Sequence, residues 1–517
     1  MSDSAAPATI GVVGAGTMGA GIAQLACLAG ARTLLHDPVP EALERGVARI
    51  PEDLAKGAAR GRWTHEDADL ASPRLEPAPS LADLAACDLV IEAAPESLSI
   101  KRDLFAALSE VVGPECVLAT NTSSLQVTSL ASAATHPERV VGMHFFNPAP
   151  LMALVEVVAG AQSSGQSLEV ARATGRAMRR RVIDATDGPG FLVNRCNRPF
   201  GGEALRLLQE RIASPHEIDR ICRLEGGFRM GPFELMDLVG IDVGFEVSKS
   251  FYEQSFGEPR WRPSPLAARM AASGQIGRKA GRGWYDYGDG PHREDDPAPP
   301  PSGGGDGPIV ITGPSPLAVE LRKLAAEAGW QVSERATEAA SPVLTLDCGD
   351  AGGDVPLDSE GLLAILCAEG SLAALDPTGA AIGFHVLPPL REATLIELTG
   401  RRDSVAGQAA ERFVTTLGKH VAWVGDGPGL VLGRIVCQIV NESAFALGEG
   451  VGSAEDIDAG MVLGMNHPRG PFAWGEAIGW EHVLSVLDAL ADEYREDRYR
   501  AAPALRRAVA AGTPPHA

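Results

Sequence analysis

The stretch Ala8–Pro38, ATIGVVGAGTMGAGIAQLACLAGARTLLHDP, decides the fold of the first part of the chain. A short apolar run at Ile10–Val13 leads into glycines at positions 14, 16 and 19. We expect a helix of small residues from there to Gly30, a residue typical of helix C-caps, followed by a second apolar run and Asp37. This order of strand, glycine turn, helix, strand and acid predicts the first βαβ unit of a doubly wound parallel sheet.

The same segment predicts a dinucleotide site. The first glycine permits a tight turn, the second lets the backbone approach a pyrophosphate, and the third lets the helix pack against the strand. The pyrophosphate then lies at the helix N-terminus, whose free N–H groups favour anions. Asp37 is placed to accept hydrogen bonds from ribose hydroxyls and would repel a 2′-phosphate, so NAD is favoured over NADP. The predicted contacts of the loop are Gly14, Gly16, Thr17, Met18 and Gly19.

Composition narrows the possible classes of protein. The chain has 517 residues and a net charge of −22, which disfavours nucleic acid as a partner. No apolar run is long enough for a membrane span, and the N-terminus lacks the basic region of a signal peptide. Eight scattered cysteines without CxxC pairs or metal-ligand spacing predict reduced thiols in the cytoplasm and no bound metal.

Two later strands are expected to end in polar residues. One strand covers Leu89–Ala93, and the next ends in the run Asn121–Ser124. Ligands bind at the carboxyl ends of parallel strands, which makes these side chains candidates for a site. The alternative is helix capping, which serine and threonine do routinely, and we favour that interpretation for Ser124.

Two segments carry a histidine followed twelve residues later by a glutamate: His144 with Glu156, and His385 with Glu397. The first histidine follows a buried-type run and precedes a proline-rich loop, which predicts a strand end facing a cleft. An acid within the alternating stretch LVEVV is unexpected unless it has a partner. An imidazole oriented by a carboxylate is typical of general-base catalysis near neutral pH.

Several motifs together resemble the L-3-hydroxyacyl-CoA dehydrogenases over residues 8–288: GAGTMGAGIA, TNTSSLQV, HFFNPAPLMALVEVVAG, GPGFLVNR and MGPFELMDLVG. The length and the stretch GGFRMGPFELMDLVGIDV further resemble the bacterial enzymes of phenylacetate breakdown that act on 3-hydroxyadipyl-CoA. The resemblance implies reversible, NAD-dependent oxidation of an L-3-hydroxyacyl-CoA to the 3-oxoacyl-CoA, on a Rossmann domain followed by an all-α helical domain. The acyl group, 3-hydroxyadipyl or 3-hydroxybutyryl, stays open.

The resemblance also implies roles for individual residues. His144 and Glu156 form the base and its partner, Ser123 and Asn194 contact the substrate, and Asn147 supports them. The implied neighbours of the nicotinamide ribose are Glu96 and Lys101, although a lysine on a helix is as often solvated. The implied CoA contacts are Lys56 and Arg62, for which a solvated basic cluster is the alternative. We also consider Arg229 as a contact for an ω-carboxylate, with a pairing to a nearby acid as the alternative.

The second half of the chain repeats the first. GDGPGLVLGR matches TDGPGFLVNR, and RGPFAWGEAIG matches MGPFELMDLVG, both at an offset of 239 residues. A shared offset without gaps predicts internal duplication. The predicted domains are an NAD-binding Rossmann domain at 8–186, a helical domain at 187–288, a Pro- and Gly-rich linker at 289–307, a degenerate Rossmann-like domain at 308–402 and a second helical domain at 403–511.

The second copy has lost most of the predicted site. The three loop glycines correspond to Gly313, Ser315 and Ala318, and the counterparts of Asn147, Asn194 and Ser123 are Pro388, Gly433 and Ala364. We therefore interpret His385 and Glu397 as structural. By resemblance to single-copy relatives that dimerise, the second helical domain is expected to form a pseudo-dimer with the first within the chain. A homodimer beyond that stays open.

Two other functions fit parts of the pattern. A non-catalytic NAD-binding structural protein of the same fold would tolerate loss of His144, Glu156 or Ser123, yet all three are present. A dehydrogenase of free hydroxy acids would be expected to carry a lysine base near Asn194, and the sequence there supplies none. The fold alone does not separate these functions.

Overall fold

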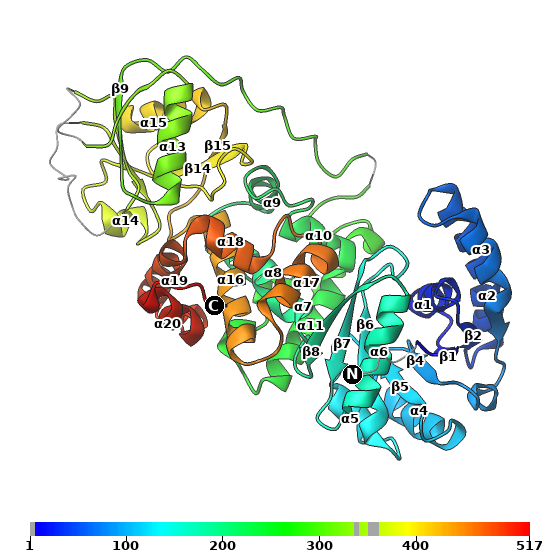
Figure 1. Cartoon of the computed structure of the whole chain (residues 1–517). Coiled ribbons are helices and arrows are strands. Elements are labelled where there is room, and N and C mark those ends of the chain that lie inside the picture. Colours follow the sequence, from blue (N-terminus) through cyan, green and yellow to red (C-terminus); the bar gives the residue numbers. More distant parts are fainter. Residues whose placement is uncertain (1–5, 289, 336–340, 350–360, 517) are drawn as a thin grey trace. The chain divides into compact units, whose positions relative to one another are not determined.

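The computed structural model describes residues 6–288, 290–335, 341–349 and 361–516. The chain divides into two compact units. The first comprises Met1–Arg195 with Gly450–Met465, and the second comprises Cys196–Glu449 with Asn466–Ala517. Each unit contains one β-sheet with helices packed against it (Figure 1).

The first unit is built on an eight-stranded sheet with the order β3-β2-β1-β4-β5-β6-β7-β8. Neighbouring strands are parallel except for β6 and β7, which pair antiparallel. The strands are β1 Thr9–Val13, β2 Arg32–His36, β3 Leu75–Pro77, β4 Leu89–Glu92, β5 Val117–Thr120, β6 Val140–Phe145, β7 Leu154–Ala159 and β8 Arg181–Thr186. The helices are α1 Thr17–Leu28, α2 Pro40–Ala59, α3 His65–Ala71, α4 Leu98–Val111, α5 Val127–Ala131, α6 Gly165–Ala177, the start of α7 Val193–Cys196, and α17 Ala454–Met465.

The core of this unit follows from the alternation of side chains along the strands. Ile10 and Val12 on β1, with Val141 and Met143 on β6, point to the same face of the sheet and belong to one buried cluster. The cluster also contains the apolar residues of α1 and α6, which cover that face. The small residues of α1 let it approach the sheet closely, as the glycine-loop pattern predicts.

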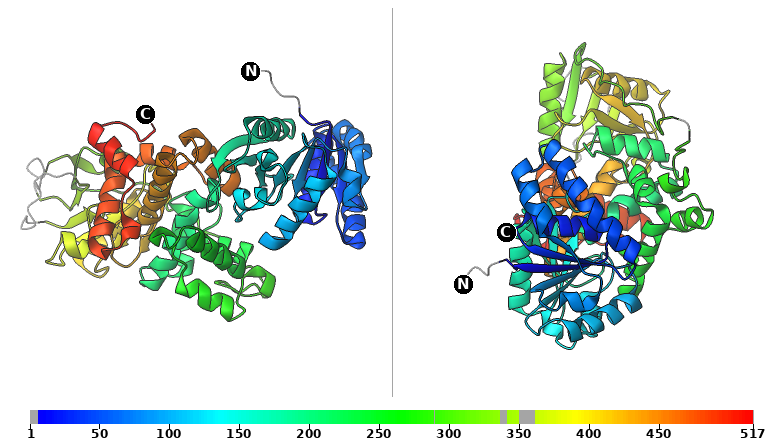
Figure 2. Two further views of the ribbon diagram at one scale, coloured as in Figure 1. Left: turned by 90° about the horizontal axis from the view of Figure 1, so that it is seen from below. Right: turned by 90° about the vertical axis from the view of Figure 1, so that its right-hand side faces the viewer.

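The second unit repeats this topology. Its seven-stranded sheet has the order β10-β9-β11-β12-β13-β14-β15, again with one antiparallel pair, β13 with β14. The sheet belongs to the green and yellow parts of the ribbon in Figure 2. The strands are β9 Pro308–Thr312, β10 Gln331–Ser333, β11 Leu344–Asp347, β12 Leu363–Leu366, β13 Ile382–His385, β14 Leu395–Thr399 and β15 His420–Trp423. The helices of this sheet region are α13 Pro316–Glu327, α14 Leu372–Leu375 and α15 Val405–Thr416. A Rossmann sheet followed by a degenerate repeat is therefore confirmed.

The remaining helices of the second unit come from both helical regions of the sequence. They are α8 Arg198–Gln209, α9 Pro215–Leu224, α10 Pro232–Val239, α11 Ile241–Gln254, α12 Pro265–Ala272, α16 Leu432–Gly448, α18 Pro471–Ile478, α19 Trp480–Tyr494 and α20 Pro503–Ala511. Helix α9 begins at Pro215, as predicted, because Ser214 and Glu217 form a capping box. Helices α8 and α16, which correspond at the 239-residue offset, pack against each other.

A buried charge cluster reinforces the contact between α8 and α16. The guanidinium of Arg434 donates to Glu203 Oε2 at 2.9 Å and to Glu210 Oε2 at 2.6 Å. It also donates to the hydroxyl groups of Tyr494 and Tyr499. Because Arg434 is only 1% exposed, this cation depends on its acidic partners, and the two copies are joined by ionic as well as apolar contacts.

Helices α9 and α17 also correspond at the repeat offset, and each packs on the sheet of the other copy. Within the first unit, α17 lies against β7 and β8. Within the second unit, α9 lies against β14. Glycines allow the first contact to be close, since a Cβ at Gly460 would come within 2.6 Å of the Val193 side chain and one at Gly464 within 2.9 Å of Leu154.

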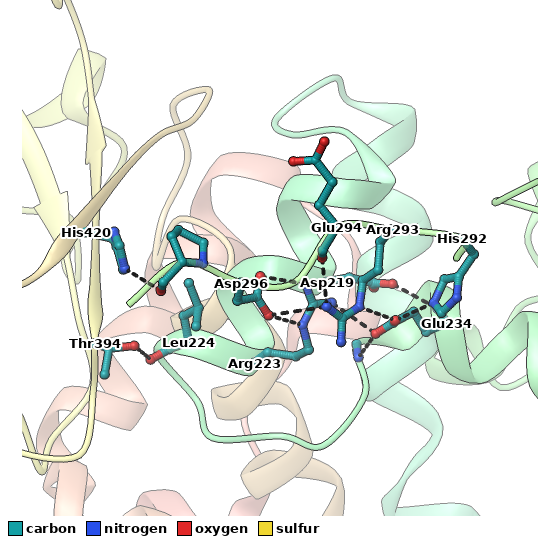
Figure 3. Close-up of polar contacts among 12 residues, drawn as sticks. Asp219, Arg223, Leu224, Glu234, His292, Arg293, Glu294, Asp296, Thr394 and His420 are labelled. Atoms are coloured by element: carbon teal, nitrogen blue, oxygen red, sulfur yellow. Dashed lines mark hydrogen bonds and ion pairs between the residues drawn. The ribbon is translucent and has the colours of Figure 1, made fainter. Parts of the chain in front are cut away.

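Residues 290–307, the described part of the predicted linker, contain no helix or strand. The segment is nevertheless held to the second unit by polar contacts (Figure 3). His292 and Arg293 contact Glu234 Oε1 at 2.7 and 2.8 Å, and Asp296 pairs with Arg223. Farther along, the Pro297 carbonyl contacts His420 Nε2 at 3.1 Å. Because this stretch carries few apolar groups, its polar and charged groups are what hold it in place.

Among the described residues, no helix has both the length and the apolar character that crossing a membrane requires.

Candidate active site

The glycine loop has the geometry that a dinucleotide requires. Gly14 has φ +102°, and a Cβ there would lie 2.6 Å from the Ala93 carbonyl oxygen. A Cβ at Gly19 would overlap the Gly14 carbonyl, so the helix can start this close only with glycine. Gly16, the N-cap of α1, has open space where a Cβ would be, and no side chain caps the helix. The N–H groups of the first turn are therefore left uncapped beside open space, as the binding of a pyrophosphate requires.

Asp37 follows β2 and is joined to the same loop. Its Oδ2 accepts a hydrogen bond from the Ala15 N–H at 2.8 Å, and its Oδ1 accepts one from the Val39 N–H at 2.9 Å. These two bonds orient the carboxylate at the carboxyl edge of the sheet. The residues present fit NAD, with the carboxylate placed for the adenosine ribose.

A buried ion pair lies beside this edge. Glu92, at the end of β4, is fully buried, and its Oε1 accepts a hydrogen bond from Lys101 Nζ at 2.7 Å. Its Oε2 accepts one from Thr120 Oγ1 at 2.7 Å. Lys101 is 1% exposed, so the alternative of a solvated helix lysine is wrong. Our sequence analysis missed Glu92 as the buried partner of Lys101, although an acid at the end of an apolar strand was a usable signal.

Lys101 also reaches Glu96, and through it the loop after β5. Lys101 Nζ lies 3.1 Å from Glu96 Oε2, while Glu96 Oε1 accepts hydrogen bonds from Thr122 Oγ1 at 2.6 Å and from the Ser123 N–H at 3.0 Å. Burial acts to raise the pKa of Glu96, but Lys101 and these donors outweigh it, so the pKa is lowered and the carboxylate stays charged. Glu96 and Lys101 therefore position Ser123.

His144 and Glu156 meet across the antiparallel strands β6 and β7. They are directly opposite in the register, and His144 Nδ1 lies 2.5 Å from Glu156 Oε2. His144 is 5% exposed and Glu156 is fully buried. The imidazole is also held by aromatic rings, with centroids 4.6 Å away at Phe146 and 5.9 Å away at Phe191. A carboxylate can only accept, so Nδ1 carries the proton and Nε2 is left as the basic nitrogen.

The second oxygen of Glu156 is bound by the backbone at the start of α7. Glu156 Oε1 accepts hydrogen bonds from the Leu192 and Val193 N–H groups, at 3.2 and 2.9 Å. This carboxylate therefore links the histidine to the segment that carries Asn194. The sequence signal for these donors was GPGF, where Gly190 has φ +71° and Phe191 φ +52°, a turn that exposes the N–H groups.

The other predicted substrate contacts are less constrained. Asn194 is partly exposed and Asn147 is exposed, and neither amide makes a hydrogen bond within the described part of the chain. The structure thus joins His144 with Glu156, and Ser123 with Glu96, while the amides of Asn194 and Asn147 remain available. Asn121, which we had not assigned a role, fixes the end of β6, since its Oδ1 accepts a hydrogen bond from the Phe145 N–H at 2.8 Å.

The predicted CoA contacts lie on the hairpin of α2 and α3. Lys56 is exposed and pairs with Glu52 and Asp53 on its own helix, at 3.3 and 3.7 Å. Arg62 lines a cavity of about 360 Å³ in the first unit. The cavity is also lined by Trp63, Leu151, Met178, Arg179, Arg180 and Asp67, so it combines an apolar wall with three guanidinium groups and one carboxylate, which lies 3.9 Å from Arg179. Arg62 is thus better placed than Lys56 for an anion.

The corresponding pair of the second copy is arranged differently. His385 and Glu397 are opposite in register, and Glu397 accepts the N–H groups of Val431 and Leu432, as Glu156 does from its own helix start. His385 Nδ1, however, has no partner among the described residues, and its Nε2 lies 3.2 Å from His482 Nε2. The histidine and the acid no longer work as a pair.

Glu225, at the end of α9, explains this change. Its carboxyl faces Glu397, and burial together with that neighbouring charge raises the pKa of Glu225 well above its ordinary value. Burial likewise raises the pKa of Glu397 to about 8. Burial, and secondly His482, lowers the pKa of His385, so the ring stays neutral. At the repeat offset Glu225 corresponds to Gly464 of α17, the helix that packs on β7 and β8 in the first unit. A glycine there supplies no carboxyl group, so Glu156 is left to His144.

Two further features of the second copy argue against the binding of a cofactor or a substrate there. A Cβ at Gly433, the counterpart of Asn194, would come within 2.2 Å of the His385 ring, so this imidazole packs directly on α16. The start of α13 is capped by Ser315, whose Oγ accepts the Ala318 N–H at 3.2 Å. The strand register also corrects one correspondence: Ala364 lies inside β12, and the counterpart of Ser123 is Ala368.

Comparison with known proteins agrees with this geometry. Residues 9–188 match the family model of the 3-hydroxyacyl-CoA dehydrogenase NAD binding domain. Residues 190–287 and 429–517 both match the C-terminal domain of that family. The duplicated helical region predicted from the sequence is therefore confirmed.

Some relatives match nearly the whole of this chain, and others match about half of it. The 3-hydroxyadipyl-CoA dehydrogenase of Escherichia coli K12 is 37% identical over 96% of this chain and 96% of that protein. A probable 3-hydroxybutyryl-CoA dehydrogenase of Deinococcus radiodurans is 40% identical over 54% of this chain and 99% of that protein. A crystal structure of 3-hydroxybutyryl-CoA dehydrogenase from E. coli K12 superimposes with a TM-score of 0.82 at 34% identity, covering 97% of this chain and 98% of that chain. The chain therefore belongs to the 3-hydroxyacyl-CoA dehydrogenase family.

Proposed function

We propose that the chain oxidises the 3-hydroxyl group of an L-3-hydroxyacyl-CoA at the site of the first copy, with His144 as the general base. The observation that carries this proposal is the contact between His144 Nδ1 and Glu156 Oε2, at the same sheet edge as the glycine loop. NAD supplies the hydride acceptor. The family membership supports the reaction class, and the relatives' names support an acyl-CoA substrate.

His144 and Glu156 carry out the proton transfer of the reaction. His144 Nε2 takes the proton from the substrate hydroxyl while hydride leaves the same carbon. Glu156 keeps the proton on Nδ1 and stabilises the imidazolium that forms, and the two backbone bonds at Leu192 and Val193 hold the carboxylate in place. In the reverse direction the imidazolium returns the proton to the 3-oxo group.

The neighbouring polar groups orient the substrate. We assign Ser123, whose N–H is bound by Glu96, and the amide of Asn194 as donors to the substrate oxygens. Asn147 is the proposed third member of this set. On the nucleotide side, Arg62 and its cavity fit the phosphates of CoA, whereas Lys56 is already paired with acids.

We further propose that the second copy is a packing partner. The contact between α8 and α16, the Arg434 cluster and the exchanged positions of α9 and α17 support a pseudo-dimer within one chain. Its altered pair and its capped α13 argue against a second catalytic site. Both 3-hydroxyadipyl-CoA and 3-hydroxybutyryl-CoA are candidate substrates. The eight cysteines, all free and buried, are consistent with the predicted cytoplasmic location.

Asp37→Ala is expected to weaken NADH binding by about 10- to 100-fold, the worth of a hydrogen bond to a charged group. NADPH binding should change much less, because losing the carboxylate also removes the repulsion of the 2′-phosphate. Titration of NADH and of NADPH into wild type and into the variant measures these affinities. Reduction of acetoacetyl-CoA by wild type with each of the two cofactors tests the proposed function. Wild-type preference for NADPH would contradict the cofactor assignment, and absence of turnover with either would contradict the function.

A further inference from the structure

Thr122 lies at the centre of the hydrogen bonds that shape the loop carrying Ser123. The residue is fully buried just after β5, and its Oγ1 donates to Glu96 Oε1 at 2.6 Å. The same Oγ1 accepts hydrogen bonds from the N–H groups of Ser124 and Leu125, at 3.3 and 3.0 Å. One buried hydroxyl therefore joins the charge of Glu96 to the turn that follows the strand.

The Oε1 atom of Glu96 is crowded with donors. Besides Thr122 Oγ1, it accepts hydrogen bonds from the Ser123 N–H at 3.0 Å, the Ser124 N–H at 3.2 Å and the Ser124 hydroxyl at 3.0 Å. A carboxylate has about four lone-pair positions, roughly two on each oxygen, so these donors already fill Oε1. Ser124 thus binds Glu96 and is not the helix cap expected from the sequence, since Gln126 is the N-cap of α5.

Lys101 fixes the other oxygen of Glu96. Its Nζ lies 3.1 Å from Glu96 Oε2 and 2.7 Å from Glu92 Oε1. A buried cation depends on its acidic partners, so Glu96 is held in place with Oε1 turned to the loop. A change at Thr122 therefore alters the set of donors around Oε1 and leaves the carboxylate where it is.

The hydroxyl of Ser123 is the most distant of the donors around Glu96. Its Oγ lies 3.5 Å from Glu96 Oε1, beyond the roughly 2.5–3.0 Å of an ordinary O–H···O hydrogen bond. Ser123 is also partly exposed, whereas Thr122 is buried. Because the nearer donors saturate Glu96 Oε1, the proton of the Ser123 hydroxyl is left for another acceptor. The substrate oxygen that the proposed function assigns to Ser123 is such an acceptor.

The second copy has lost both hydroxyl groups. In the strand register that makes Ala368 the counterpart of Ser123, Cys367 takes the place of Thr122. Cys367 Sγ lies 3.8 Å from the Ile365 carbonyl oxygen, so it contacts its own strand. The two hydroxyl groups are thus missing together from the copy that we propose to be non-catalytic, as expected if one serves the other.

We infer that Thr122 is a positioning residue for the reaction: its hydroxyl occupies Glu96 and so leaves the Ser123 hydroxyl to donate to the substrate oxygen. The inference rests on the proposed function. As hydride reaches the 3-oxo carbon, negative charge develops on that oxygen, and a hydrogen bond donated to it becomes stronger. Without the Thr122 hydroxyl, Glu96 Oε1 has room for Ser123 Oγ, which would then turn from the substrate toward the carboxylate.

Thr122→Val and Thr122→Ser test this inference, because valine keeps the shape without the hydroxyl and serine keeps the hydroxyl. With acetoacetyl-CoA and NADH, Thr122→Val should lower kcat by about 3- to 12-fold, the contribution of one hydrogen bond, and change KM for acetoacetyl-CoA by less than about twofold. Thr122→Ser should stay within about twofold of wild type. Thr135→Val is the matched control, since Thr135 is exposed and its hydroxyl donates to Glu110 Oε1 at 3.3 Å; its kcat should equal wild type.

A double-mutant cycle with Ser123→Ala separates positioning from packing. If Thr122 acts through Ser123, Thr122→Val should lower kcat by no more than about twofold on the Ser123→Ala background. Thr122→Cys repeats the cycle if Thr122→Val does not fold, because a thiol is a weak donor and cysteine stands at this place in the second copy.

Three results would overturn the inference while the proposed function stands. They are an equal loss of kcat on both backgrounds, a loss in Thr122→Ser as large as in Thr122→Val, and wild-type kcat in Thr122→Val or in Ser123→Ala. A wild-type chain that does not reduce acetoacetyl-CoA with NADH would instead overturn the proposed function.

Discussion

His144→Ala is expected to lower kcat by about 10²–10⁴, the usual contribution of a positioned general base. Among the described residues the imidazole is the only basic group that contacts Glu156, and backbone hydrogen bonds keep that carboxylate in place without it. NADH affinity should change little, because the glycine loop and Asp37 that would hold the dinucleotide do not depend on His144.

Steady-state rates with acetoacetyl-CoA and NADH, together with single-turnover rates, measure this effect. His136→Ala is a matched control, since His136 is exposed and contacts only Glu138 in the described structure, so its turnover should equal wild type. A His144→Ala variant that keeps more than half of wild-type turnover, with chemistry rate-limiting, would remove His144 from the mechanism.

Removal of residues 308–517 is expected to abolish the soluble single-chain form. The deletion takes away α17, which packs on β7 and β8, and α16, which packs on α8. It would uncover Leu154 and Val193 beside the catalytic pair and leave Glu203 without Arg434. A large apolar patch of this kind leads to self-association or aggregation.

Light scattering after size-exclusion chromatography distinguishes the outcomes. A dimeric 1–307 fragment or an aggregate would agree with the account, because either would cover the face that α16 and α17 leave. A fully soluble, monomeric fragment would show that the second half does not cover the first.

The βαβ unit could be predicted because its determinants are local. Three glycines, two apolar runs and Asp37 lie within one stretch, and β1, α1 and β2 occur where that stretch places them. The contact between His144 and Glu156 was predicted for a similar reason, since an acid in an alternating run requires a partner, whereas the antiparallel pairing of their strands was not predicted.

Features that depend on tertiary contacts could not be predicted. In the sequence, Lys101 has the pattern of an ordinary solvated helix lysine. Its burial depends on β4, which brings Glu92 into contact with it. Likewise, the loss of the second pair depends on Glu225, which lies more than 150 residues before Glu397 in the sequence. The counterpart of Ser123 was misassigned because the strand register, and not the composition, determines which alanine follows β12.

The number of NADH molecules bound by one full-length chain tests the central claim most directly. Only the first copy has an open Gly16 at an uncapped helix start, whereas Ser315 occupies that position and caps α13 in the second. Calorimetric titration should therefore find one NADH site per chain. Two sites per chain would contradict the account, because the second copy would then bind the cofactor that we assign to the first alone.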